Sequence, residues 1–169
     1  MNDPNGVARM NVASVRDPGE SQGDRPMDDL VQFAQKAIII HDGNLLMVRK
    51  SDDHPYHPGC WEIPGGRLRS DECLDEGLRR EVHEEVALDV APARPLAMWM
   101  WRPIGVDTII VVVRQCAIVG EPVAYLTANA VREHISDVQW VPLGEVDGYQ
   151  INRTAKRPIL DALARVTAG

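Results

Sequence analysis

The chain has 169 residues, of which 44% are hydrophobic, and this suits one globular domain with a buried core. Its formal net charge is -7 and it has no sustained run of Lys or Arg, so binding to a nucleic-acid polymer is disfavoured. No apolar run approaches the ~20 residues that span a bilayer, and the N-terminus lacks the pattern of a secretory signal, so we expect a cytoplasmic protein without membrane contact.

Residues 1–30 are rich in Asn, Asp, Gly, Pro and Ser and show no apolar periodicity. This composition predicts a flexible N-terminal tail in front of a folded domain at residues 31–169. The negative charge gathers in two places, because residues 1–29 hold three Arg against six acidic residues and residues 66–88 hold four Arg against seven.

Strand patterns alternate with turn signals through the first part of the domain. A β-branched run at 37–40 and an apolar run at 45–49 flank Asp42-Gly43, which predicts a hairpin of two antiparallel strands. A polar loop with prolines follows at 51–59. A short strand at 61–63 then stops at a Pro-Gly-Gly turn.

The clearest helix follows this turn. Ser70 offers an N-cap, and four aliphatic residues form an i, i+4 stripe: Leu74, Leu78, Val82 and Val86. Strands are predicted at 96–101, 106–119 and 138–141, before a C-terminal helix with Pro158 in its first turn. The inner face of that helix would be formed by Ile159, Leu160, Leu163 and Val166. Strands with one internal helix and one terminal helix, each covering one face, predict a mixed α/β sandwich.

Three carboxylates share one face of the internal helix. Glu81, Glu84 and Glu85 are spaced i, i+3, i+4, which destabilises an isolated helix unless a cation lies among them. Oxygen ligands favour a hard divalent cation such as Mg²⁺ or Mn²⁺. The cysteines and histidines show no metal-ligand spacing. Arg80 lies beside the carboxylates and can orient one of them, with Glu72 as its other partner.

These residues resemble the Nudix box of the Nudix hydrolases. Gly66, five residues, Glu72, seven residues and then the run 80–88 match the pattern G-x5-E-x7-R-E-U-x-E-E-x-G-U, where U is a bulky aliphatic residue. The last glycine is the single departure, because Ala87 stands there; a left-handed C-cap at Ala would cost about 1 kcal/mol. The resemblance implies a Nudix-type α/β/α sandwich with a mixed β-sheet. It also implies hydrolysis of a nucleoside diphosphate linked to another group, with Mg²⁺ or Mn²⁺.

The resemblance also implies roles for individual residues. The metal ligands would be the carbonyl of Gly65 and the carboxylates of Glu81, Glu84 and Glu85. Arg80 and Glu72 would be the orienting pair of the catalytic site. The catalytic base is Glu81 in some members and a residue of a later loop in others; Glu133 is the loop candidate here, and a plain exposed charge is an equal alternative for it.

Candidate substrate contacts come from outside the box. Trp99 and Trp101 face one side of a strand and can stack a nucleobase, although core packing is the alternative for either. Arg49 and Lys50 end a strand near the expected site and can meet phosphate, with solvated strand-end charges as the alternative.

Two classes of small-molecule nucleotide compete as the substrate. The short chain resembles compact members that hydrolyse (d)NTPs, including oxidised nucleotides, and we expect that activity. Pro103, fifteen residues after the box, favours ADP-ribose or another nucleotide sugar instead. A non-catalytic nucleotide-sensing module stays an alternative, although such modules often lose a box carboxylate and this chain keeps all of them. The oligomeric state is left open, with a homodimer as one alternative.

Overall fold

The computed structural model describes residues 31–102 and 107–168, so the tail predicted at 1–30 and Pro103 lie outside the described residues. Six strands form one mixed sheet in which β3, β2, β1, β5 and β4 follow one another and β6 pairs with β2. The elements in chain order are β1 (Val31–His41), β2 (Asn44–Lys50), β3 (Trp61–Glu62), α1 (Leu74–Val86), β4 (Asp89–Trp101), β5 (Thr108–Val119), α2 (Ala128–Arg132), β6 (Ile135–Pro142), η1 (Leu143–Gly148) and α3 (Arg153–Thr167).

The sheet combines a hairpin with a parallel crossover. β1 and β2 are antiparallel, and the turn between them has positive φ at Asp42 and Gly43, as the Asp-Gly signal predicts. β1 also pairs with β5 in parallel, and β5 pairs with β4 antiparallel. The sheet is therefore mixed, as expected from the sequence.

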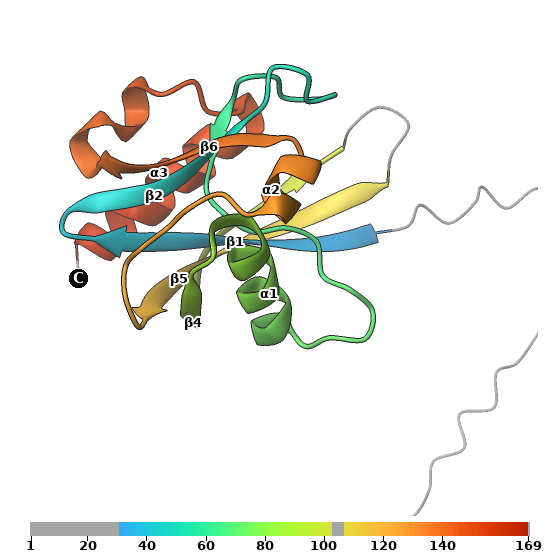
Figure 1. Cartoon of the computed structure of the whole chain (residues 1–169), viewed down its shortest axis with the longest axis horizontal. Helices are drawn as coiled ribbons and strands as arrows, with labels where there is room; N and C mark the ends of the chain where they lie inside the picture. Colours follow the sequence, from blue (N-terminus) through green and yellow to red (C-terminus); the bar gives the residue numbers. More distant parts are fainter. Residues whose placement is uncertain (1–30, 103–106, 169) are drawn as a thin grey trace, which may run out of the picture.

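Helices cover the two faces of the sheet (Figure 1). α1 packs on one face through Leu78, Val82 and Val86, while α3 packs on the other through Ile159 and Leu163. The strand β1 serves both layers because its side chains alternate between the faces. This arrangement confirms the predicted α/β/α sandwich. No helix in the described part of the chain has the length and apolar character needed to cross a membrane.

Two predicted helix starts are wrong. α1 begins three residues after the expected position, with Cys73 as its N-cap, because the Glu76 side chain accepts a hydrogen bond from Cys73 N at 3.1 Å. Ser70 lies in the preceding turn, and Leu74 is half exposed rather than part of the buried stripe. α3 begins after Asn152, whose Oδ1 accepts from Thr154 N, so Pro158 lies inside the helix rather than in its first turn.

Ala87 adopts the left-handed conformation that its place in the box requires. Its φ is 57° at the C-cap of α1, and its N–H donates to His83 O at 3.0 Å.

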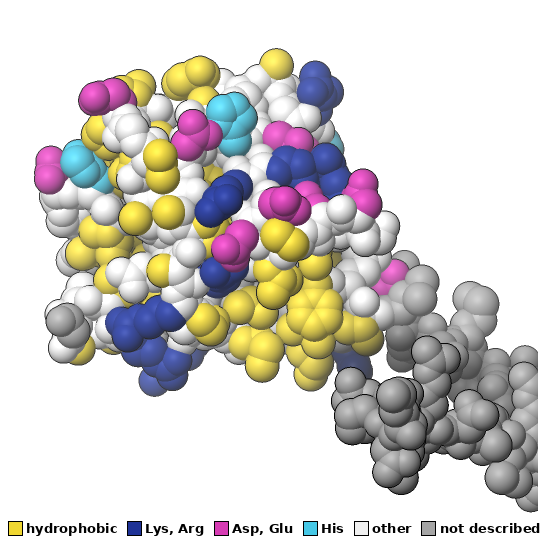
Figure 2. Space-filling view, turned by 90° about the horizontal axis from the view of Figure 1, so that it is seen from below, with side chains coloured by type: hydrophobic (Ala, Val, Ile, Leu, Met, Phe, Trp, Pro, Cys, Tyr) yellow, Lys and Arg dark blue, Asp and Glu magenta, His cyan; other side chains and the backbone are white. Residues whose placement is uncertain are grey.

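Figure 2 shows the face that carries α1, where acidic and basic side chains lie close together and a group of hydrophobic side chains remains at the surface. Met98 and Met100 of β4 are among the exposed hydrophobic residues, at 68% and 60%.

Candidate active site

A cavity of about 420 Å³ opens between the sheet and the end of α1. Its wall combines acidic, basic and aromatic side chains from distant parts of the chain. The lining residues used below are Lys36, Lys50, Tyr56, His57, Glu62, Gly65, Glu81, Glu85, Trp99, Trp101 and Glu133. The sequence analysis named seven of these eleven as candidates, and the cavity brings them together.

The Pro-Gly-Gly turn is held against β1. Gln35 N donates to Gly66 O at 2.9 Å, and Ala37 N donates to the carbonyl of Pro64 at 2.8 Å. Gly65 has a φ of +121°, and a Cβ there would lie 2.3 Å from Gln35 O. Glycine is therefore required at this position by both its backbone angle and its packing.

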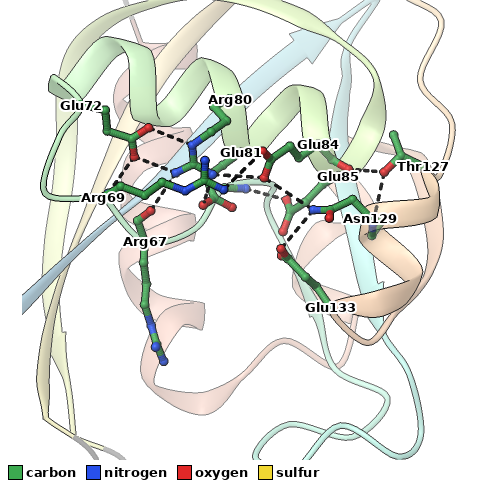
Figure 3. A network of polar contacts seen from close by, with 12 residues as sticks. Arg67, Arg69, Glu72, Arg80, Glu81, Glu84, Glu85, Thr127, Asn129 and Glu133 are labelled. Carbon is green, nitrogen blue, oxygen red and sulfur yellow. Dashed lines mark hydrogen bonds and ion pairs between the residues drawn. The ribbon is translucent and has the colours of Figure 1, made fainter.

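Arg80 links Glu72, which lies just before α1, to two carboxylates of α1 (Figure 3). Its guanidinium donates to both oxygens of Glu72 at 2.7 and 2.8 Å, to Glu81 at 2.7 Å and to Glu84 at 3.1 Å. The hydrogen bond from Arg80 is the main reason that the pKa of Glu72 lies at about 2. The two residues expected to form an orienting pair are thus in direct contact.

Glu133 joins the carboxylates of α1 although it lies far away in sequence. One oxygen each from Glu81, Glu84 and Glu133 falls within 4.8 Å of the other two. Asn129 Nδ2 donates to Glu133 Oε1 at 3.1 Å and to Glu84 Oε2 at 3.5 Å, as Figure 3 shows. These oxygen atoms suit a hard divalent cation, so the donor set fits Mg²⁺ or Mn²⁺.

The segment before α2 brings Glu133 to this place. Thr127 N and Oγ1 donate to the carbonyls of Glu85 and Glu84 at the end of α1, and Tyr125 N donates to Val86 O. The same Thr127 caps α2 by accepting from Ala130 N at 3.1 Å. Thr127 therefore provides hydrogen-bond donors for carbonyl groups in the last turn of α1 and also caps the helix that ends next to Glu133.

Glu85 lies deeper than the other carboxylates of the box. It is 1% exposed, and its Oε2 accepts from Gly65 N at 2.8 Å. Burial raises the pKa of Glu85 to about 7, although Lys36 and Lys50 act in the opposite direction. A cation at this site would favour the ionised form, since metal ligands bind deprotonated.

Lys36 was not predicted from the sequence, whereas Lys50 was one of the two candidates for a phosphate contact at the end of β2. Both ammonium groups contact Glu62 Oε1, at 3.2 and 2.9 Å, and they hold the pKa of Glu62 at about 2 against the opposing effect of burial. A lysine inside the β-branched first strand was the available signal for Lys36. Arg49 was the other candidate, but it pairs with Asp52 at 2.6 Å and does not line the cavity as the described residues form it.

Aromatic rings form the remaining wall. Trp99 and Trp101 lie on the cavity side of β4, and the ring of Trp101 is 5.7 Å from Tyr56 and 5.1 Å from His57. Burial lowers the pKa of His57, so its imidazole is neutral near pH 7. This wall offers uncharged flat surfaces beside the charged part of the cavity.

The fold and the carboxylate site define a Nudix-type domain, and comparisons with known proteins agree. The NUDIX domain model matches residues 33–163, so the chain belongs to the Nudix family. Nucleoside triphosphatase NudI of Escherichia coli O139:H28 is 41% identical over 49 residues, which cover 29% of this chain and 35% of that protein. The matched part is therefore about a third of the length of that relative.

Solved structures share the fold at low sequence identity. A MutT protein from Methanosarcina mazei Go1 superposes with a TM-score of 0.65 at 22% identity, covering 84% of this chain and 96% of that chain. An ADP-ribose pyrophosphatase from Streptococcus suis gives a TM-score of 0.58 at 21% identity, covering 79% and 91%. These structures support the architecture of the whole described domain.

Proposed function

We propose that the protein is a nucleotide pyrophosphohydrolase that needs Mg²⁺ or Mn²⁺ and cleaves a pyrophosphate bond, with a (d)NTP or an oxidised nucleotide as substrate. The observation that carries this proposal is the convergence of the carboxylates of Glu81, Glu84 and Glu133, two of which, Glu81 and Glu133, line a cavity that also has an aromatic wall. A polyanionic phosphate chain needs the divalent cation that these carboxylates would hold, and a nucleobase can stack on the aromatic wall.

The carboxylates of Glu81, Glu84 and Glu85 and the carbonyl of Gly65 would hold the cation. Bound there, the cation would neutralise phosphate charge, activate water and stabilise the leaving phosphate. Arg80 would keep Glu81 and Glu84 in position, because its guanidinium already contacts both. Because Glu72 holds the other side of that guanidinium, Glu72 acts on the site through Arg80.

Either Glu81 or Glu133 would accept the proton of the attacking water. Glu81 is 8% exposed, and burial raises its pKa in the metal-free protein, whereas a cation on the same carboxylate would favour the ionised form that accepts a proton. Glu133 is exposed, its Oε1 accepts a hydrogen bond from Asn129, and one of its carboxylate oxygens lies within 4.8 Å of an oxygen of Glu81. Comparing the pH profiles of Glu81→Gln and Glu133→Gln would assign the base.

The preference for nucleoside triphosphates rests on the relationship to NudI, described as a nucleoside triphosphatase. The structural likeness to an ADP-ribose pyrophosphatase keeps nucleotide sugars as the second candidate. Mass spectrometry of products formed in ¹⁸O water distinguishes the two. We expect a nucleoside monophosphate and pyrophosphate from a (d)NTP, whereas faster formation of AMP and ribose 5-phosphate from ADP-ribose would contradict the preferred substrate.

Trp101→Leu is expected to raise KM for the preferred nucleotide by about tenfold and to change kcat by less than about threefold, since base stacking contributes to binding. Steady-state kinetics at saturating Mg²⁺ measure both constants. Trp140→Leu is the matched control, because Trp140 is also partly buried but lies on β6 beside His41. If KM rises equally in both variants, Trp101 does not stack on the nucleobase.

A further inference from the structure

Lys36 places its ammonium on the backbone oxygen proposed as a metal ligand. Its Nζ donates a hydrogen bond to the Gly65 carbonyl and also lies 3.2 Å from Glu62 Oε1. The side chain is 13% exposed, so the surrounding protein holds it in this position. Gly65 itself is fixed from the other side, because its N–H donates to Glu85 at 2.8 Å.

Two ammonium groups share one carboxylate at this wall of the cavity. Lys50 Nζ lies 2.9 Å from the same Glu62 oxygen that Lys36 contacts. Among the described residues, Glu62 is the one carboxylate in ion-pair contact with these two ammonium groups, and the cavity's other glutamates are those proposed for the metal or the base: Glu81, Glu85 and Glu133. A buried ammonium that shares its carboxylate is stabilised further when an anionic group of a ligand pairs with it.

A divalent cation on the Gly65 carbonyl would compete with Lys36 for the same oxygen. Two cations on one carbonyl lie within a few ångströms of each other, and their repulsion is strong in a partly buried site. The side chain of lysine has four methylene groups and can move its ammonium without moving the strand. Lys36 also lines the cavity, so an alternative position inside it is within reach.

We propose that Lys36 is an exchangeable ammonium, which holds the Gly65 carbonyl in the metal-free protein and turns to a phosphate oxygen of the substrate when the divalent cation binds. The inference rests on the proposed metal site. The exchange makes metal and substrate binding mutually favourable, because the cation releases the ammonium and the phosphate gives it a new partner.

Mn²⁺ binding to Lys36→Met, followed by electron paramagnetic resonance without substrate, tests the competition. We expect the Kd for Mn²⁺ to fall by about tenfold in this variant and by no more than about threefold in Lys50→Met. Lys50 is the matched control, since it has the same charge and the same contact with Glu62. Equal effects in both variants, or no effect in Lys36→Met, would overturn the exchange.

The nitrogen signals of the lysine ammonium groups in the wild-type protein provide a second measurement that does not depend on a variant's stability. Adding Mg²⁺ without substrate is expected to move the Lys36 signal and leave the Lys50 signal in place, with assignment by loss of the signal in Lys36→Arg. An unmoved Lys36 signal at saturating Mg²⁺ would overturn the exchange.

Kinetics at saturating Mg²⁺ test the second half of the proposal. Lys36→Met is expected to raise KM for a nucleoside triphosphate by about tenfold with kcat within about threefold, and an unchanged KM would contradict the phosphate contact. Failure of the wild-type protein to bind Mn²⁺ would overturn the proposed metal site and the exchange together. Equal Mn²⁺ affinity of wild type and Lys36→Met would overturn the exchange alone.

Discussion

Glu85→Gln is expected to lower kcat for nucleotide hydrolysis by about 10³-fold or more at saturating Mg²⁺. The carboxylate is fully buried and accepts from Gly65 N, so an amide in its place keeps the shape and removes the charge that a cation needs. Initial rates over a range of Mg²⁺ concentrations measure the effect. Glu145→Gln, at an exposed carboxylate of η1, is the control and should keep the wild-type rate.

Although Glu85→Gln lowers kcat, it is expected to stabilise the metal-free protein against unfolding. The pKa of Glu85 is raised from 4.5 to about 7, so the folded state binds its proton more tightly than the unfolded state. This group therefore destabilises the fold as pH rises from about 4.5 to 7, by roughly 3 kcal/mol at pH 8. Glu85→Gln should be more stable than wild type at pH 8, with the difference shrinking toward pH 5.

Urea unfolding of both proteins in the presence of a chelator measures this difference. If the Glu85→Gln protein hydrolyses nucleotide as fast as the wild type, Glu85 is not a ligand of the catalytic metal. A variant that is less stable than wild type at pH 8 would show instead that the ionised carboxylate stabilises the fold through Lys36 and Lys50.

Gly65→Ala is expected to lower the free energy of unfolding by about 3 kcal/mol or more, since the new side chain has no room. A Cβ there would lie 2.3 Å from Gln35 O and 3.0 Å from Lys36 Cα, both of them backbone atoms. The φ of +121° adds strain for any residue with a side chain. Thermal or urea unfolding measures the loss.

Gly144→Ala is the matched control for this variant. A Cβ at Gly144 would meet no atom within 4 Å, and its backbone angle is an ordinary one, so we expect a change within about 0.5 kcal/mol. Equal stability of the two alanine variants would show that the turn can move away from β1 without cost.

The sequence predicted the parts of the site that depend on local spacing. Glu81 and Glu84 share a helix face whatever the rest of the fold does, and Arg80 reaches Glu72 because the loop before α1 folds back on it. Lys36 could not be predicted in the same way. Its contact with the Gly65 carbonyl depends on how a turn packs on a strand 29 residues earlier.

The limits of strands and helices were predicted less well, for physical reasons. The strand predicted at 96–101 is longer in the structure, where β4 runs from Asp89 to Trp101 and includes Pro92 and Pro95. Among the described strands β4 lies at the edge of the sheet, where a missing N–H costs little. Ser70 is a good N-cap by residue type, but Glu76 and Cys73 form a capping box further along the chain. Tertiary context selects between such local alternatives.

Hydrolysis of nucleotides by the wild-type protein after removal of metal tests the central proposal most directly. A panel of nucleoside triphosphates and nucleotide sugars would be incubated with and without added Mg²⁺ or Mn²⁺, and released pyrophosphate or phosphate would be measured. The account predicts turnover of at least one nucleoside triphosphate that depends on the added metal and is lost in Glu85→Gln. Absence of turnover across the panel with both metals, in a protein that still binds nucleotide, would contradict the enzyme and favour a nucleotide-sensing module.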